Sequence, residues 1–181
     1  METQLACAQE IGVMFRTFRW HSTRGERREF ELKLDGVPSG GLYWPSEAST
    51  YAQARFGENL WVFCREGFLN PWISVRQMGA SADLATLSPD WRGGGLVQFA
   101  GGAHFEVVPG NYWEPEWRIL DDLGETVIRF GPADEASMTG FASQAVGVAL
   151  PEPTLLVLLG WYLLVMHALD TRAPTFRGKD V

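Results

Sequence analysis

The segment Leu155–Met166 has twelve consecutive residues without a charge, in the order Leu-Leu-Val-Leu-Leu-Gly-Trp-Tyr-Leu-Leu-Val-Met. Pro153 before the run and His167 after it are typical of the first and last turns of a helix, so we expect a helix over about residues 154–169. Apart from one hydroxyl and one indole nitrogen, this helix has no polar face. A helix that is apolar on every side is buried on every side, in protein or in lipid.

Length distinguishes these two environments. A helix that spans a bilayer needs about 20 apolar residues, whereas a run of about 10–14 is more typical of a protein core. We therefore expect a helix buried in protein and keep a helix inserted in lipid as the alternative. Core contacts are expected from Leu155, Leu158, Gly160 and Trp161. Gly160 either lets a bulky side chain approach the helix backbone, at a helix-propensity cost of about 1 kcal/mol, or is simply tolerated.

The residues before this helix form short aromatic and β-branched runs separated by turn signals such as Asp35-Gly36 and Pro109-Gly110. Strands are expected near residues 11–19, 28–34, 50–56, 59–65, 71–77, 82–87, 95–100, 103–108, 116–121 and 125–130. This hairpin spacing is typical of an antiparallel sandwich or a closed barrel. Runs that are apolar on both faces, such as Leu60–Cys64, suggest packing against both sides. Ala133–Ala149 is expected to be a loop with a short irregular strand or turn.

The expected helix and strands have matching lengths. Sixteen helical residues span about 24 Å, and strands of six or seven residues span about 20–23 Å. A barrel wide enough to admit the helix would bury it on all sides. The predicted fold is therefore mainly β, a closed antiparallel β-barrel of about 10–12 strands with a buried hydrophobic C-terminal helix. We expect one domain over residues 1–170 and a flexible tail over 171–181.

Two segments are distinctive: Trp91-Arg-Gly-Gly-Gly-Leu and Leu155-Leu-Val-Leu-Leu-Gly-Trp-Tyr-Leu-Leu. These two segments and Ala52–Phe63 are similar to a group of bacterial proteins. The predicted threaded barrel and the strand–turn–strand unit Trp117–Arg129 resemble the tubby C-terminal-like superfamily, which includes phospholipid scramblases and LURP-one-related proteins. Over roughly residues 28–170 the chain is most similar to a group of uncharacterised bacterial proteins. The resemblance implies a strand barrel threaded by a helix.

The tubby resemblance also implies phosphoinositide binding through surface lysines and arginines. This chain departs from that pattern, because it has two lysines and a net charge of −7. No lipid-binding residue is therefore carried over from the family. The acidic balance also argues against nucleic-acid binding, which needs cations to neutralise phosphates. Cys7 and Cys64 are too few for a disulfide framework or zinc finger, and they favour a cytoplasmic location.

The sequence contains no strong catalytic or metal-binding motif. The residues His21, His104 and His167 are dispersed, and we expect no cofactor and no metal site. His104 and Glu106 lie two apart on an expected strand, so they share one face and would form an acid–base pair if a cleft existed. The ordinary interpretation is a solvated strand face. Asp121-Asp122 is interpreted as a turn rather than a calcium site.

Eight tryptophans are an enrichment with two possible roles. Four of them are expected to fill the barrel and helix interface: Trp61, Trp72, Trp117 and Trp161. Trp44 and Trp113 are expected to be exposed and to mark a ligand or partner surface. We expect a soluble, non-enzymatic interaction or ligand-binding module for a protein or a lipid-like ligand. The alternatives are a membrane-associated protein with helix 154–169 in lipid, and an enzyme using His104 and nearby carboxylates.

Overall fold

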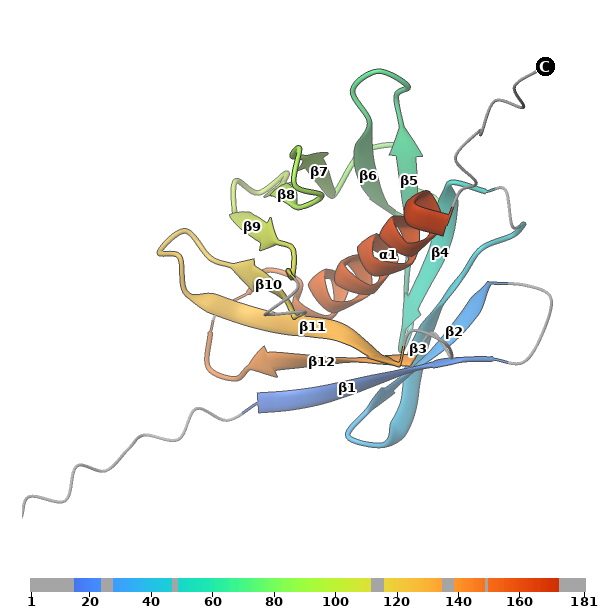
Figure 1. Ribbon diagram of the computed structural model, residues 1–181, viewed down its shortest axis with the longest axis vertical. Helices are drawn as coiled ribbons and strands as arrows, with labels where there is room; N and C mark the ends of the chain where they lie inside the picture. Colours follow the sequence, from blue (N-terminus) through green and yellow to red (C-terminus); the bar gives the residue numbers. More distant parts are fainter. Residues whose placement is uncertain are drawn as a thin grey trace, which may run out of the picture.

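The computed structural model describes residues 15–23, 28–46, 49–111, 116–134, 139–148 and 150–172. In these residues twelve strands enclose one helix (Figure 1). The elements are β1 (Phe15–Ser22), β2 (Glu29–Leu34), β3 (Val37–Tyr43), β4 (Tyr51–Phe56), β5 (Asn59–Glu66), β6 (Trp72–Gln77), β7 (Ala85–Pro89), β8 (Gly95–Phe99), β9 (His104–Val108), β10 (Trp117–Leu120), β11 (Thr126–Asp134), β12 (Thr139–Ala145) and α1 (Pro153–Arg172).

Every strand pairs antiparallel with the strand before it and the strand after it. The first and last strands also pair, with Trp20 of β1 opposite Gly140 of β12, and this pairing closes the barrel. The predicted fold class, a closed antiparallel β-barrel with a hydrophobic C-terminal helix, is confirmed. Tight turns join most neighbours, and glycines with positive φ, such as Gly36 and Gly57, supply the backbone conformation that these turns need.

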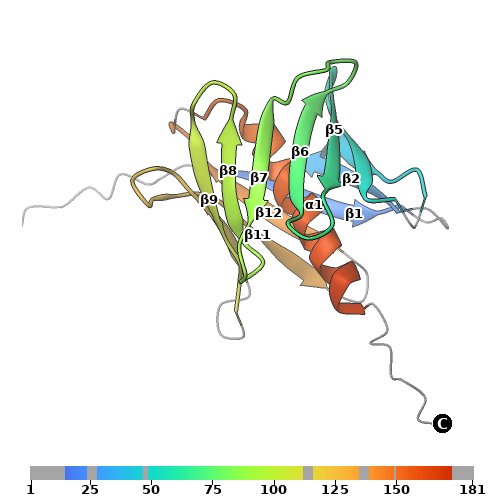
Figure 2. The same cartoon turned by 90° about the horizontal axis from the view of Figure 1, so that it is seen from above.

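Helix α1 runs through the barrel, as Figures 1 and 2 show from two directions. Leu155, Leu158 and Trp161 are all buried, and so is Gly160. The C-terminus of α1 emerges at the barrel end that holds Glu66 and Pro89, which we call the helix-exit end. There Asp170 of α1 pairs with Arg65 of β5 at 2.8 Å.

Alternating side chains of each strand point toward α1. In β1, for example, Phe18 and Trp20 are fully buried, whereas Arg19 between them is exposed. On β5 the outward residues Val62 and Cys64 are only half-buried. The inward face of this strand meets the helix, and its outer face is only partly covered.

Small residues let the helix lie close to the strands. A β-carbon at Gly160 would lie 3.1–3.2 Å from three carbons of the Phe130 ring, so the close-approach interpretation of this glycine is the one the structure supports. A second close contact lies between β12 and the helix, where a β-carbon at Gly140 would collide with the ring of Trp161. Both glycines are therefore required by packing against α1.

Two strands were not predicted. Strand β3, which contains Pro38, Gly40 and Gly41, lies between the expected strands near 28–34 and 50–56, where no strand was assigned. Strand β12 falls in the Ala133–Ala149 segment, where at most a short irregular strand was expected; it has seven residues and pairs with β1 and β11. The tail was expected from residue 171, but α1 continues through Arg172; the rest of the expected tail, residues 173–181, lies outside the described residues.

Candidate functional site

Because α1 and its aromatic neighbours occupy the barrel interior, the candidate contact surfaces lie on the outside. Trp44 was expected on such a surface, and this expectation was wrong. Its side chain is fully buried, stacked on Tyr162 with ring centroids 5.6 Å apart and packed edge-on against Phe30. The ring lies between β2 and the helix, so Trp44 belongs to the core. Trp113 lies outside the described residues.

The other expected core tryptophans divide into two groups. Trp61, Trp117 and Trp161 are buried, as expected. Trp72 is 40% exposed, because it opens β6 at the helix-exit end and points to the outer face. Trp72 directly follows the β5–β6 turn, which carries two of the most exposed apolar side chains among the described residues.

Three large apolar side chains project from the helix-exit end, and together we call them the apolar rim. Phe68 and Leu69 of the β5–β6 turn are 96% and 87% exposed, and Trp91 of the β7–β8 turn is 88% exposed. The two turns belong to adjacent hairpins, since β6 pairs with β7. Pairing of Glu66 with Trp72 and of Pro89 with Gly95 places both turns at this end of the barrel.

Local contacts shape the backbone in both turns. Gly67, with φ of +79°, opens the first turn, and the Trp72 ring lies over it, so that a β-carbon there would be 2.8 Å from the ring. In the second turn the backbone N–H of Asp90 donates to Gly94 (3.0 Å). The Asp90 carboxylate accepts from the Arg92 N–H (2.8 Å). These contacts shape the backbone beside Phe68 and Leu69 and around Trp91.

Charges near the rim are paired. The Arg92 guanidinium lies over the Trp91 ring, 4.9 Å from its centroid, in a cation–π contact. At the base of the first hairpin, Glu66 accepts hydrogen bonds from Ser74 (2.6 Å) and Arg76 (3.0 Å). The fully buried Ser74 is thereby satisfied.

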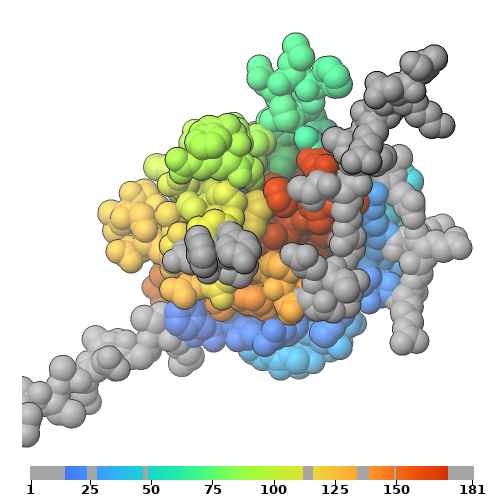
Figure 3. Space-filling model, viewed as in Figure 1, coloured from blue at the N-terminus to red at the C-terminus, as the bar shows by residue number. Residues whose placement is uncertain are grey.

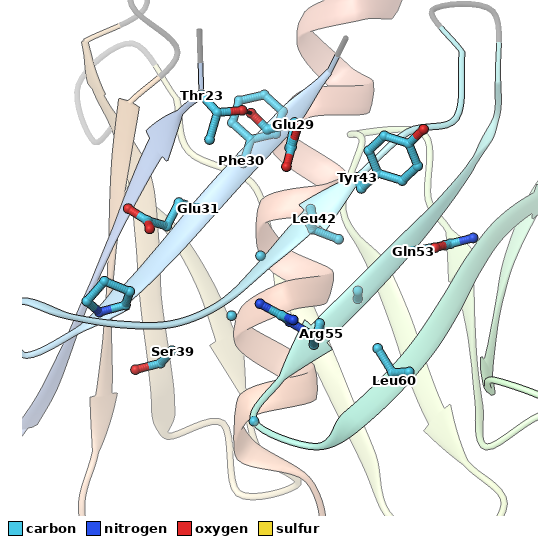
Figure 4. Close-up of a pocket in the computed structure, with 15 residues that line it drawn as sticks. Thr23, Glu29, Phe30, Glu31, Ser39, Leu42, Tyr43, Gln53, Arg55 and Leu60 are labelled. Atoms are coloured by element: carbon cyan, nitrogen blue, oxygen red, sulfur yellow. Dashed lines mark hydrogen bonds between the residues drawn. The ribbon is translucent and has the colours of Figure 1, made fainter. Parts of the chain in front are cut away.

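A shallow hollow of about 670 Å³ lies over β2, β3 and β4 (Figure 4). Glu29 and Glu31 border it from β2, and Arg55 borders it from β4. The hollow exists because β3 carries Gly40 and Gly41. A β-carbon at Gly41 would collide with the Phe30 carbonyl oxygen, so the close packing of β2 and β3 requires glycine at this position. Because glycine has no side chain, the surface above it is hollow.

A second hollow, of about 580 Å³, brings together the residues of the enzyme alternative. His104 and Glu106 of β9 line it with the turn residues Asp121 and Asp122. The Asp121 carboxylate accepts N–H groups of the residues at 123 (3.0 Å) and 125 (2.9 Å), so it serves the turn, as expected. His104 and Glu106 are exposed. Across the described part of the chain, no three His, Cys, Asp or Glu residues are grouped to hold a metal ion.

Burial raises the pKa values of two groups, one inside the barrel and one on its wall. Burial raises the pKa of the Tyr162 hydroxyl, which donates a hydrogen bond of 2.6 Å to the Thr50 carbonyl oxygen. Burial also raises the pKa of the Cys64 thiol, and the nearby Glu66 carboxylate adds to the effect while Arg76 opposes it. Both groups are therefore kept protonated at neutral pH, which makes Cys64 a poor nucleophile.

The apolar rim was missed at the level of sequence, although a signal was present. Phe68 and Leu69 lie between Gly67 and Asn70-Pro71, so two large apolar residues occupy a segment with strong turn signals. Apolar residues at a turn tip are exposed whatever the fold, because hairpin turns lie at the surface. Trp91 beside Arg92 and Gly93 gives the same signal.

Helix α1 is also apolar and long enough to cross a membrane, judged by length and composition over Pro153–Asp170, and 61% of that window is buried inside the barrel. No family model matches the chain, and neither curated proteins nor solved structures gave a significant match.

Proposed function

We propose that this chain is a non-enzymatic, tubby-like interaction module that contacts its partner through the apolar rim. The proposal is supported by the placement of α1, which fills the space that other barrels use for an internal ligand. Contacts are thereby directed to the outer surface. The observation that carries the proposal is the exposure of Phe68, Leu69 and Trp91 at one end of the barrel.

The energetics support a contact role for these side chains. Burial of a large apolar side chain that is otherwise exposed contributes about 1.5–3 kcal/mol. Phe68, Leu69 and Trp91 make little contribution to the core, since each is at least 87% exposed.

The two alternatives have less support. A helix inserted in lipid would need α1 to leave the barrel and expose the inner faces of the strands, including Phe18 and Phe63, which are fully buried. An enzyme built on His104 would use a hollow whose carboxylate Asp121 is engaged by backbone N–H groups.

Site-specific photo-crosslinking in cells tests the proposal. A benzophenone amino acid is placed at Leu69 of the full chain, and a matched control chain carries it at Leu123. Leu123 is 81% exposed and belongs to the β10–β11 turn, which is not one of the two turns of the rim. We expect adducts with protein or with lipid from position 69 and none of the same kind from position 123. Equal adducts from both positions, or none from either, would contradict the proposal.

A further inference from the structure

We propose that the partner of the apolar rim is a lipid bilayer surface, into which Phe68, Leu69 and Trp91 insert while α1 stays inside the barrel. This inference rests on the proposed function, because it names the partner of the same rim. It differs from the alternative in which α1 itself enters the membrane. The strands and the helix keep their contacts, and only the turn tips leave water.

The shape of the rim favours a bilayer over a protein. The β5–β6 turn stands out from the body of the molecule, at the top of Figure 3, and the β7–β8 turn forms a second projection on the same face. The two tips are thus separate and convex. A protein partner would need two matching recesses, whereas a fluid bilayer surface accepts convex apolar tips without a preformed pocket.

The chemistry of the tips fits the layer between lipid tails and water. The first turn, Gly67-Phe68-Leu69-Asn70-Pro71, has no ionisable side chain, and in the second turn Asp90 balances Arg92. Insertion therefore desolvates no net charge. Trp91 has an apolar body with a polar N–H, and the Arg92 guanidinium stacks on it. Tryptophan and arginine are suited to this layer, since each keeps its polar group among the headgroups.

The orientation of the barrel is compatible with this contact. Figure 2 shows the β5–β6 and β7–β8 connections on the side of the barrel where the C-terminal end of α1 emerges. The helix-exit end therefore faces the bilayer. The hollow over β2–β4 shares no lining residue with the two turns, whereas the hollow beside His104 reaches Asp90 at the base of the β7–β8 turn.

The net charge of the chain distinguishes insertion of apolar side chains from electrostatic adsorption to the membrane surface. A net charge of −7 opposes approach to an anionic membrane. Binding through apolar insertion should therefore need no anionic lipid and should depend little on salt. Lysine-dependent or arginine-dependent phosphate binding would show the opposite behaviour.

Vesicle flotation with the full chain tests the inference, using vesicles of phosphatidylcholine alone and vesicles that also contain phosphatidylserine. We expect the chain to float with phosphatidylcholine, and its partition to change by less than about twofold when salt rises within the range that screens exposed charges. The double substitution Phe68→Ser/Leu69→Ser and the single substitution Trp91→Ala should each lower the partition about tenfold or more. Leu123→Ser is the matched control and should float like the unmodified chain.

Three results would overturn the bilayer proposal. They are failure of the unmodified chain to float, equal flotation of the Phe68→Ser/Leu69→Ser variant, and association that requires phosphatidylserine. Thermal unfolding of each variant checks that the barrel is intact, because exposed turn substitutions should leave the transition unchanged.

The crosslinking experiment separates failure of this inference from failure of the proposed function. Protein adducts at position 69 without flotation would keep the interaction module and overturn the bilayer partner. If sedimentation shows that the chain self-associates through the rim, the interaction module would again be kept and the bilayer partner overturned. The partner would then be a second copy of the chain. Loss of both flotation and adducts would overturn both proposals.

Discussion

The ring of Phe130 on β11 lies directly against the backbone of Gly160 on α1, with three ring carbons 3.1–3.2 Å from the place where a β-carbon would be. Both residues are buried. The contact brings the helix and the barrel wall together at a point where even one methyl group is tight.

Gly160→Leu should therefore lower the free energy of unfolding by about 3 kcal/mol, because overpacking forces the helix away from the Phe130 ring. Urea denaturation would measure the loss. The substitution Phe130→Leu frees space at the same point, so in a double-mutant cycle it should offset part of the Gly160→Leu cost. Strictly additive costs would contradict the direct contact.

Gly140→Ala should also destabilise the barrel, by about 1–3 kcal/mol. Its new methyl group would collide with Trp161, whose ring is held by stacking on Trp20 with centroids 5.2 Å apart. Gly101 supplies a matched control, since a β-carbon there meets no atom within 4 Å and its φ is not positive. Gly101→Ala should change the free energy of unfolding by no more than about 1 kcal/mol. Equal effects at the two glycines would refute the proposed packing.

Leu158→Asp should abolish soluble, folded protein, because Leu158 is fully buried and a carboxylate there would have no partner in an apolar core. The milder Leu158→Ala should cost about 2–5 kcal/mol. Leu123→Asp, at an 81% exposed turn position, should fold like the unmodified chain. Expression, solubility and circular dichroism would compare the three variants. A folded Leu158→Asp protein would show that α1 is dispensable for the barrel.

Tyr162→Phe removes the hydroxyl that donates to the Thr50 carbonyl oxygen and should cost about 1 kcal/mol at pH 7. The pKa of Tyr162 is raised in the folded protein from a reference value of 10.0. Its protonated state therefore contributes stability that is complete below pH 10 and is lost as pH rises above it. Above pH 10 the unmodified chain should lose up to about 1.4 kcal/mol per pH unit relative to Tyr162→Phe.

Urea denaturation of both chains between about pH 7 and pH 11 checks this prediction, and the difference between them removes the contribution of the other tyrosines. The two stability curves should converge above pH 10. A constant difference across the range would mean that the Tyr162 hydroxyl is not buried in the folded state.

Much of the architecture could be predicted because the signals were local. The alternation of apolar and charged residues in Phe30–Leu34 predicts one buried face, and the apolar run Leu155–Met166 predicts a buried helix. The matched lengths of the strands and the helix then predict a barrel with the helix inside. The strands β3 and β12 lacked such a signal for a tertiary reason. The inward positions Gly140 and Ala142 of β12 are small because the helix lies close to them, so the strand resembles a loop when read alone.

The surface was less predictable than the core. Trp44 follows β3 and precedes Pro45, a context that favours exposure, yet its ring stacks on Tyr162, which is more than one hundred positions away in the sequence. Contacts between residues so far apart produce no periodic pattern in the sequence. The rim at Phe68, Leu69 and Trp91 depends on the pairing of β6 with β7, which brings two separate turns to one end.

Among the described residues, the element that fills the barrel is also the last element in chain order. Twelve strands therefore emerge from the ribosome with apolar inner faces that have nothing to enclose until Pro153–Arg172 has been synthesised. Pairing of β1 with β12 likewise waits for residues made late. Folding dominated by such distant contacts is slow and leaves apolar strands exposed to aggregation. Production of this protein in cells should thus depend on how well the nascent strands are protected before the helix arrives.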